Sequence, residues 1–363
     1  MDIEVLNDSV LQEDIEILAG KINSLGCFNN KTVLITGASG LLGSQAVKAF
    51  LCCNRLYGTK INIIAFCRTI ENAQKAFENL KDRGYFKIII GDIKKPLNID
   101  DVVDYIMHAA GKTGNSKIHV DHPADTINTA VFGTYNVLEF AKEKNISGLV
   151  YFSSLEVYGQ TDPNKDCIYE DDYGYIDLMQ PRSSYKESKR LCENMCLAYS
   201  NEFSVPASIG RLSLTFGPGV RDNDNRVFAQ FARSVINKQD IVLKTTGKTL
   251  RNHCYIRDAL WALILIMVKG ARCEAYNIVN PDTAMSIIDM AKMVAGLFED
   301  SEINVRIELD DPKKYGYNSY LKCLLNSDKL QSLGWKPEVD LKNMYIRMIK
   351  SMKEEADNAK RRK

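Results

Sequence analysis

Residues 31–51 read KTVLITGASGLLGSQAVKAFL, and this stretch decides the fold. KTVLITG is rich in β-branched and apolar residues, as a short buried strand is, and the residues after Ser39 carry apolar side chains at helical spacing. Between the two, Gly37, Gly40 and Gly43 follow the spacing G-x-x-G-x-x-G. A strand, a glycine-rich turn and a helix in this order predict a loop whose backbone N–H groups approach a pyrophosphate at the helix N-terminus.

Strand-like and helix-like segments alternate after this loop. The strand-like runs are residues 61–67, 86–92, 102–111, 148–154 and 206–218. Apolar residues at helical spacing fill the intervals between them. Alternation of this kind implies right-handed crossovers and a parallel sheet with helices on both faces. We therefore predict an α/β fold, a Rossmann-type doubly wound parallel sheet with a smaller C-terminal α/β lobe for the substrate.

The changes in rhythm predict three parts of the chain. Residues 1–30 form an N-terminal helical extension, which Ser9 and Gln12 begin as a capping box. Its apolar stripe consists of Leu11, Ile15, Leu18, Ile22 and Leu25. Residues 31–217 form a dinucleotide-binding domain, and residues 218–363 are mainly a substrate-binding lobe, with the chain crossing between the two. The helices expected in that lobe are residues 226–237, 257–269, 286–298 and 340–353.

The composition excludes several classes of partner. With 47 Lys and Arg against 46 Asp and Glu, the chain has no basic excess that would favour nucleic acid or a membrane surface. Its longest apolar run, residues 259–268, is half the roughly 20 residues of a membrane span. The ten cysteines include no C-x-x-C pair, and the four histidines do not lie beside them at ligand spacing, so we expect no metal site. Free thiols of this kind indicate a reducing compartment, and we expect a cytoplasmic protein.

The ends of the predicted strands supply the dinucleotide site. The glycine loop contributes Gly37, Ser39, Gly40, Leu41, Leu42 and Gly43. The second strand ends in Arg68 without the carboxylate that holds the ribose hydroxyls of NAD, so Arg68 favours NADP or, alternatively, stacks on the adenine. The fourth strand ends in Ala109, Ala110 and Gly111, which are small enough to let the backbone approach the cofactor.

Tyr185 and Lys189 lie four residues apart on a predicted helix, so both project from one face. A free tyrosine has a pKa of about 10, too high for a base at neutral pH, but a nearby ammonium and a positive nicotinamide ring lower that pKa by roughly 1–3 units. The preceding strand ends in Ser154, which supplies a hydroxyl to orient a substrate oxygen. The three residues together predict proton abstraction from a hydroxyl, coupled to hydride transfer.

The segments TGASGLLG, GD, HAAG, SSLEVYG and YKESK occur in the order and spacing of the extended short-chain dehydrogenase/reductases. The chain thereby resembles the NAD-dependent epimerase/dehydratase family over residues 31–340. The resemblance implies NAD as the cofactor, Ser154 as the catalytic hydroxyl, Tyr185 as the base and Lys189 as its partner.

The same resemblance implies roles for residues outside this group. Asp92 and Ile93, which close the third strand, are expected to meet the adenine. Asn128 is expected on the helix behind the site. The family also leads us to expect a homodimer, formed through the helices at residues 131–145 and 183–200.

Within this family, four segments are similar to those of the UDP-glucuronate decarboxylases. They are RSSYKESKRLCENMCLAY, TFGPGVRDNDNRVFAQF, TLRNHCYIRDA and LQSLGWKPEVDL. The likeness implies a nucleotide-sugar substrate, with Arg226 and Arg251 contacting its diphosphate or its sugar. The chain departs from the family at Leu214, where the family keeps an Asn that touches the nucleotide-sugar. It departs again at Leu155, where the sugar 4,6-dehydratases place an acid.

These residues predict a reaction that begins with oxidation of the sugar C4 hydroxyl. The 4-keto sugar then acidifies C5, and three outcomes stay open. In the first, a C6 carboxylate leaves as CO2. In the second, the 4-keto sugar rotates in the site and is reduced again to the C4 epimer. In the third, Glu156 takes the C5 proton for a 4,6-elimination, which Leu155 cannot assist as an acid. We rank the three in that order. A rival from another class is an NADP-dependent ketone or lactone reductase, which Arg68 and Leu214 favour; an inactive dinucleotide sensor is disfavoured because the catalytic residues are present.

Overall fold

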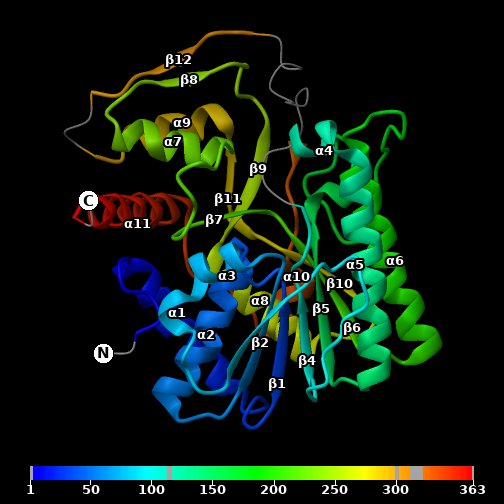
Figure 1. The fold of residues 1–363 in the computed structure, drawn as a ribbon. Helices are drawn as coiled ribbons and strands as arrows, with labels where there is room; N and C mark the ends of the chain where they lie inside the picture. The colour runs from blue at the N-terminus through cyan, green and yellow to red at the C-terminus, as the bar shows by residue number, and fades with distance from the viewer. Residues whose placement is uncertain (1–2, 113–116, 299–301, 311–321, 362–363) are drawn as a thin grey trace.

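The computed structural model describes residues 3–112, 117–298, 302–310 and 322–361. A seven-stranded sheet lies at its centre, in the order β10-β6-β5-β4-β1-β2-β3 (Figure 1). Its strands are β1 (Thr32–Thr36), β2 (Asn62–Cys67), β3 (Phe86–Ile90), β4 (Tyr105–His108), β5 (Gly148–Ser154), β6 (Ala207–Leu212) and β10 (Ala275–Ile278). Every neighbouring pair is parallel, so the predicted doubly wound parallel sheet is confirmed.

The order of the strands reverses between β1 and β4. From β1 the chain runs through β2 and β3 to one edge of the sheet, and from β4 it runs through β5 and β6 toward the other. In open sheets of this kind a ligand binds in the crevice outside the carboxyl ends of the strands at such a reversal. Gly37 follows β1 and Ala109 follows β4, so the predicted dinucleotide loops meet at this crevice.

Helices cover both faces of the large sheet (Figure 1). They are α2 (Leu41–Tyr57) and α8 (Ile256–Lys269) on one face, and α5 (Pro123–Lys144) and α6 (Ser183–Phe203) on the other. Successive side chains of a strand point to opposite faces. In β1, Val33 and Ile35 accordingly join the core on the α2 side, whereas Leu34 joins the core on the α5 and α6 side. Among the described residues no helix is long and apolar enough to cross a membrane.

A smaller lobe lies above the large sheet in Figure 1. Its sheet has the order β11-β9-β13, with β7 also paired to β9, and a separate pair joins β8 to β12. These strands are β7 (Leu214–Phe216), β8 (Ile241–Leu243), β9 (Leu250–Tyr255), β11 (Asn280–Ser286), β12 (Val305–Ile307) and β13 (Lys322–Cys323). The helices expected beyond residue 218 are present as α7 (Val227–Ile236), α8, α9 (Ile287–Ala295) and α11 (Leu341–Arg361). The remaining short elements are α3 (Ile70–Phe77), η1 (Glu78–Leu80), α4 (Lys117–Asp121), η2 (Leu155–Tyr158) and α10 (Asp328–Gln331).

The run at residues 206–218, predicted as one strand, is two strands in two different sheets. Leu212, the last residue of β6, pairs with Ser154 in the large sheet, and Leu214, the first residue of β7, pairs with His253 in the lobe. Between them, the Ser213 backbone N–H donates to the carbonyl oxygen of Ile278. The prediction was wrong here because a continuous apolar run has the same local pattern whether or not it changes sheet.

The N-terminal helix α1 (Ser9–Leu25) is present, but its predicted capping box is wrong. The cap is Asp8, whose carboxylate accepts a hydrogen bond from the Leu11 backbone N–H at 2.9 Å. Gln12 instead accepts from the Val5 backbone N–H at 2.8 Å. An aspartate one position earlier is an equally good cap, and capping by it places Ser9 inside the helix. The apolar stripe of α1 packs against α2, α8 and α11, as the periodicity predicts.

Candidate active site

The glycine loop is built so that only glycine fits at two of its positions. Gly37 has φ +64°, and a Cβ there would lie 2.8 Å from the Cα of Ala110. A Cβ on Gly43 would lie 2.5 Å from the carbonyl oxygen of Gly37. The helix that follows has Gly40 as its N-cap, with no side-chain cap. The first backbone N–H groups of α2 therefore have no partner within the helix and are available to a diphosphate.

Ser39 is the point at which the lobe reaches this loop. Its carbonyl oxygen accepts a hydrogen bond from Arg221 Nη2 at 3.2 Å. Arg221 lies in the loop after β7, so it brings a cation from the lobe to the mouth of the predicted diphosphate site. Sequence reasoning missed Arg221, because nothing in the segment GVRDNDNR indicates that it folds back on the glycine loop.

The residues predicted for the adenosine end lie together at the ends of β2 and β3. Arg68 is exposed directly after β2, and Lys94 lies near enough for the two positive charges to interact. Asp92 stays near the surface and accepts from the Lys94 backbone N–H at 3.0 Å. The carbonyl oxygen of Ile93 accepts from the buried Asn136 amide at 2.9 Å. Asn136, which was not predicted, fixes this turn from helix α5.

Asn128 lies on α5 as expected, but its side chain is exposed. The residues at the end of β4 lie beside the glycine loop. The Ala110 backbone N–H donates to Thr36 Oγ1 at 3.2 Å, which ties the end of β4 to β1 beside the glycine loop. A Cβ on Gly111 would lie 3.9 Å from Lys189 Nζ. The backbone at Ala109, Ala110 and Gly111 therefore runs from the glycine loop to Lys189.

The fold brings Ser154, Tyr185 and Lys189 together. Ser154 ends β5, and its hydroxyl lies near enough to Tyr185 to lower the pKa of the phenol. Lys189 Nζ donates to the carbonyl oxygen of Phe152 at 2.6 Å and lies 5.9 Å from the centre of the Tyr185 ring. Tyr185 and Lys189 share one face of α6, as their spacing predicts.

Burial sets the protonation of this group. Burial raises the pKa of Tyr185 to about 12, against the opposing effect of the nearby Ser154 hydroxyl. Burial also lowers the pKa of Lys189 to about 8. The lowered pKa of Tyr185 that we expect from the ammonium and the nicotinamide ring together is therefore not found in the chain by itself. Tyr185 needs a further positive charge, of the kind that a nicotinamide ring supplies, before it can act as a base near neutrality.

Glu156 lies two residues after Ser154, in η2, and is held by cations. Arg182 Nη1 and Nη2 donate to its two carboxylate oxygens at 3.0 and 3.2 Å, and Lys186 Nζ lies 3.9 Å away. Burial by itself raises the pKa of Glu156, but the charges of Arg182, Arg251 and Lys186 outweigh it and lower that pKa to about 2. Glu156 is therefore a permanent carboxylate and cannot serve as a proton donor near neutral pH.

Arg182 and Lys186 were not among the predicted site residues. A signal for them existed in the sequence, because they lie four residues apart and flank Tyr185 on the same helix, so both face the same neighbour. Nothing in the sequence indicates that this neighbour is Glu156. The Nε atom of Arg182 is buried without a hydrogen-bond partner among the described residues.

The two predicted substrate arginines differ in their surroundings. Arg226 is already paired with Asp224, at 2.6 Å, and lies over the ring of Phe228. Its charge still reaches Tyr185 and lowers the pKa of that residue. Arg251 on β9 has a buried Nε with no partner in the described part of the chain, and its charge reaches Glu156. Within the described part of the chain, Arg226 has a carboxylate partner within 4 Å, whereas Arg251 has none.

The two residues that depart from the family lie in one small hydrophobic cluster. Leu155 is 7% exposed and packs with Val157, Tyr158 and Cys323, and Leu214 packs against the same group. The Leu155 side chain is thus part of a core beside the site. It offers no acid or hydrogen-bond donor to a substrate.

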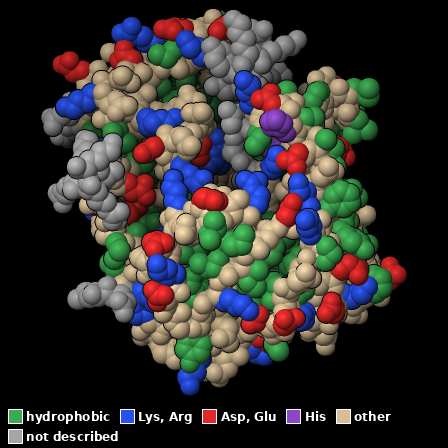
Figure 2. Space-filling view, in the orientation of Figure 1, with side chains coloured by type: hydrophobic (Ala, Val, Ile, Leu, Met, Phe, Trp, Pro, Cys, Tyr) green, Lys and Arg blue, Asp and Glu red, His purple; other side chains and the backbone are tan. Residues whose placement is uncertain are grey.

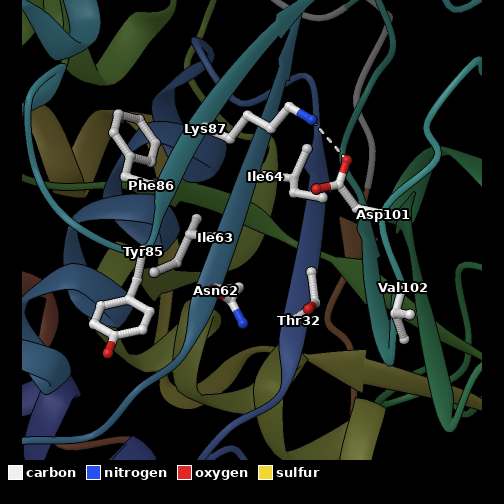
Figure 3. A pocket seen from close by; sticks show the side chains of 9 residues that line it. All are labelled: Thr32, Asn62, Ile63, Ile64, Tyr85, Phe86, Lys87, Asp101 and Val102. Carbon is white, nitrogen blue, oxygen red and sulfur yellow. Dashed lines mark hydrogen bonds and ion pairs between the residues drawn. The ribbon is translucent and has the colours of Figure 1, made fainter.

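Figure 2 shows a hollow between the large sheet and the lobe, with lysine and arginine side chains around it. A separate hollow of about 390 Å³ lies near the amino ends of β1, β2 and β3 (Figure 3). Its lining residues are Thr32, Asn62, Ile63, Ile64, Tyr85, Phe86, Lys87, Asp101 and Val102. The glycine loop and Ser154 follow the carboxyl ends of their strands, so this second hollow is not part of the candidate site.

The sequence pattern of the NAD dependent epimerase/dehydratase family matches residues 33–280. The chain is 28% identical over 332 residues to UDP-glucuronic acid decarboxylase 1 of Xenopus tropicalis, which covers 91% of this chain and 74% of that protein. It is 30% identical over 330 residues to UDP-glucuronic acid decarboxylase 3 of Arabidopsis thaliana, with 88% of each chain covered. Its structure is similar to that of UDP-glucuronic acid 4-epimerase from Bacillus cereus, solved with UDP-glucuronic acid and NAD. That likeness has a TM-score of 0.73 at 21% identity and covers 89% of this chain and 99% of the other. The resemblance read from the sequence motifs is thereby confirmed.

Proposed function

The chain belongs to the NAD-dependent epimerase/dehydratase family and is a nucleotide-sugar-modifying enzyme, and from this premise we propose that it decarboxylates a nucleotide-linked uronic acid. The proposed substrate is UDP-glucuronate, whose C6 carboxylate leaves as CO2 after the C4 hydroxyl has been oxidised. Relatives at 28–30% identity are named UDP-glucuronic acid decarboxylases, which supports this choice.

The charge around Glu156 is the observation that carries the proposal. One carboxylate faces three cations, Arg182, Lys186 and Arg251. Arg182 is engaged by Glu156, which leaves Lys186 and Arg251 as surplus positive charge in a partly buried place. Burial lowers the pKa of Lys186, so an anion beside it would favour its charged form. A sugar with a carboxylate at C6 supplies that anion, whereas a neutral hexose does not.

The residues of the crevice fit a nicotinamide dinucleotide. Gly37 packs closely against Ala110, which brings the glycine loop to the end of β4, and the uncapped start of α2 leaves N–H groups for a diphosphate. Asp92 and Ile93 would meet the adenine, and Gly111 lies beside Lys189, where the nicotinamide ribose would be held. When bound, the cofactor accepts the hydride from C4 of the sugar and returns it at the end of the reaction.

The chain's own residues would handle the proton and the carboxylate. Ser154 orients the C4 hydroxyl, and Tyr185 takes its proton as the C–H electrons leave with the hydride. Lys189 keeps Tyr185 in a positive environment. The C4 oxygen receives the electron pair of the C5–C6 bond as an enolate when CO2 departs, so no acid is needed to expel a leaving group. C5 then takes up a proton from water, which re-forms the C4 ketone. Tyr185 then returns its proton to the C4 oxygen when the ketone is reduced.

A second candidate is epimerisation of the same uronic acid at C4. The cationic group at Glu156 supports recognition of the carboxylate but does not decide its fate, and the structural relative from Bacillus cereus is named a UDP-glucuronic acid 4-epimerase. A 4,6-dehydratase is less well supported, because no acid is present at position 155 for the C6 hydroxyl. Leu155 lies in a hydrophobic cluster, and Glu156 is held as a carboxylate and so cannot replace the missing acid. An enzyme of that type needs a general acid for the C6 hydroxyl, which is worth about 10²–10⁴ in rate.

Self-association through α5 and α6 is part of the proposal. The two helices pack against each other on the outside of the sheet (Figure 1). They carry several large hydrophobic side chains that are more than a third exposed, namely Ile127, Phe132, Tyr135, Leu191 and Leu197. Exposed apolar groups clustered on neighbouring helices are typical of a protein–protein contact, and a second copy of the chain would cover them.

A cytoplasmic setting is also proposed. All ten cysteines lie within the described residues, and they are free thiols. Thiols that stay reduced are typical of a reducing compartment.

Substrate choice tests the carboxylate assignment. The specificity constant kcat/KM should be far higher for UDP-glucuronate than for UDP-glucose. Arg251→Met should reduce kcat/KM for UDP-glucuronate about tenfold or more, as expected for the loss of a charge-assisted hydrogen bond. Lys60→Met, which removes an exposed lysine elsewhere, is the matched control and should leave it unchanged. Equal turnover of the two sugars, with no effect of Arg251→Met, would argue against an acidic substrate.

A further inference from the structure

His119 lies directly against the tyrosine of the active site. Its ring stacks on the ring of Tyr185, with the centroids 4.4 Å apart and the planes 26° from parallel. His119 belongs to α4, a one-turn helix, and its side chain is 4% exposed. Neither the sequence motifs nor the reaction steps above give this residue a role.

Two contacts hold His119 in place from both sides. The hydroxyl of Ser184, the neighbour of Tyr185, donates to the His119 carbonyl oxygen at 3.3 Å. The imidazole Nδ1 lies 3.2 Å from Thr126 Oγ1. Thr126 donates its own proton to the carbonyl oxygen of His122 at 3.0 Å, so it can only accept from His119. The hydrogen-bond pattern therefore assigns the proton to Nδ1 and leaves a lone pair on Nε2.

The imidazole is held neutral at the pH at which such an enzyme works. Burial, together with the charge of Arg182, lowers the pKa of His119 to about 4 against the opposite effect of Glu156. Lys112 and Lys189 act in the same direction as Arg182. A neutral ring adds no charge of its own beside Tyr185. Its effect on the tyrosine must therefore come from contact and from the exclusion of water.

Contact of this kind would fix the direction of the phenol. A tyrosine ring with one open face can swing about its side-chain bonds, whereas an aromatic ring stacked on that face removes this freedom. The Tyr185 hydroxyl has to meet both Ser154 and the C4 hydroxyl of the sugar. A misplacement of about 1 Å at such a group can cost on the order of 100-fold in rate.

We propose that His119 is a positioning residue for Tyr185, whose stacked neutral imidazole holds the phenol in line with Ser154 and shields it from water during C4 oxidation. The inference rests on the proposed function only in taking Tyr185 as the base. It does not depend on whether the 4-keto sugar loses CO2 or is epimerised. Formation of the reduced nicotinamide in a single turnover is therefore the suitable readout, since it reports C4 oxidation whatever product follows.

The test compares His119→Phe, which keeps a flat ring, with His119→Leu, whose branched side chain cannot cover the face of the Tyr185 ring. His119→Phe should keep the single-turnover rate within about threefold of the unmodified protein. His119→Leu should lower that rate about 10- to 100-fold, with the KM for substrate nearly unchanged. His122→Ala removes an exposed histidine that follows the same helix and is the matched control, expected to have no effect. Retained dinucleotide binding and an unchanged thermal transition would show that each variant is folded.

A pH profile separates positioning from a purely structural role. The groups that face Tyr185 are Tyr151 and Ser154 on β5, Glu156 on η2, Arg182 at the start of α6, Lys189 on α6, and Arg226 before α7. All of them remain in both variants. In His119→Leu, water gains access to the phenol and relieves the burial that raises the pKa of Tyr185. The limb of the rate profile that belongs to Tyr185 should then move to lower pH, while in His119→Phe it should stay in place.

Two results would overturn the inference. Unchanged rates and an unmoved limb in His119→Leu would show that the stack does not position Tyr185. Equal losses in His119→Phe and His119→Leu would assign the effect to the imidazole nitrogens and not to the flat ring. A failure of the proposed function has a different signature, because Tyr185→Phe would then retain C4 oxidation in a protein with the original His119.

Discussion

Arg182 holds Glu156 through two parallel hydrogen bonds, 3.0 and 3.2 Å long, and this pair keeps the carboxylate ionised next to the candidate catalytic tyrosine. This pair excludes one role for Glu156 and favours one class of substrate. Glu156 cannot donate a proton, and the cations left over beside it favour a substrate that carries its own carboxylate.

The pair predicts how stability depends on pH. The pKa of Glu156 is lowered from an ordinary 4.5 to about 2 in the folded chain, so the pair stabilises the fold fully above pH 4.5 and loses its contribution as the pH falls toward 2. Glu156→Gln should lower the free energy of unfolding by about 3 kcal/mol at neutral pH, because it leaves the Arg182 charge unpaired. The difference from the unmodified protein should shrink as the pH falls below 4.5.

Urea unfolding at a series of pH values measures this difference. Glu78→Gln is the control, because Glu78 pairs with Lys81 in an exposed position where both side chains are more than half accessible. An exposed pair contributes about 0–1 kcal/mol. A loss in Glu156→Gln that is small, or that does not change with pH, would contradict the account of this pair.

Tyr185→Phe should leave dinucleotide binding nearly intact and abolish turnover, because it removes only the proton acceptor. Lys189→Met should weaken both, since Lys189 lies between Gly111 of the cofactor crevice and the Tyr185 ring. Binding is measured by the quenching of protein fluorescence and turnover by product formation. Activity of Tyr185→Phe within tenfold of the original, with cofactor shown to be bound, would remove Tyr185 from its assigned role.

We predict that Arg68 favours NADP over NAD. It is exposed at the end of β2, with Lys94 nearby as a second cation and no carboxylate at the end of that strand. Arg68→Ala should weaken NADP binding more than NAD binding, by roughly the 1.5–3 kcal/mol of a charge-assisted hydrogen bond. Titration calorimetry with both dinucleotides measures the two losses. Equal losses would mean that Arg68 stacks on the adenine and does not recognise the 2′-phosphate.

Phe132 tests the proposed dimer. Its side chain is 52% exposed on α5, within the apolar surface shared with α6. Phe132→Glu should convert a dimer to a monomer, because it places a charge in the centre of a surface that a second copy covers. Light scattering after size exclusion reports the mass. Val102→Glu, at a residue 75% exposed near the amino ends of the sheet, should leave the mass unchanged. A monomer in the unmodified protein would contradict this part of the proposal.

Much of the fold could be predicted because local pattern and global fold agree in the large sheet. Val33, Leu34 and Ile35 are all buried, as a strand covered on both faces requires, and Gly37 occupies a position that only glycine tolerates. The change of sheet at Ser213 could not be predicted, since the residues on either side of it are equally apolar. The cap at Asp8 was missed because Ser9 and Gln12 also match the sequence pattern of a helix start, that of a capping box.

The residues of the candidate site likewise include some that the sequence predicts and some that it does not. Ser154, Tyr185 and Lys189 could be found because each belongs to a motif with fixed local spacing. Arg182 and Arg221 could not, because their partners lie far away in the sequence and only the folded chain brings them together. Contacts made by long side chains across elements leave no periodic signal. His119 belongs to this class as well, since its contact with Tyr185 joins α4 to α6.

The central claim is that the protein removes CO2 from a nucleotide-linked uronic acid. Purified protein should be incubated with UDP-glucuronate and, separately, with UDP-, dTDP- and CDP-glucose, and the sugar-nucleotide products should be weighed by mass spectrometry. We predict a product lighter than UDP-glucuronate by one CO2, absent with Tyr185→Phe, and no reaction of the glucose nucleotides. A product of unchanged mass with a new retention time would contradict decarboxylation and establish the epimerase. Rapid loss of water from a glucose nucleotide would contradict both, and would mean that a residue other than Leu155 supplies the acid.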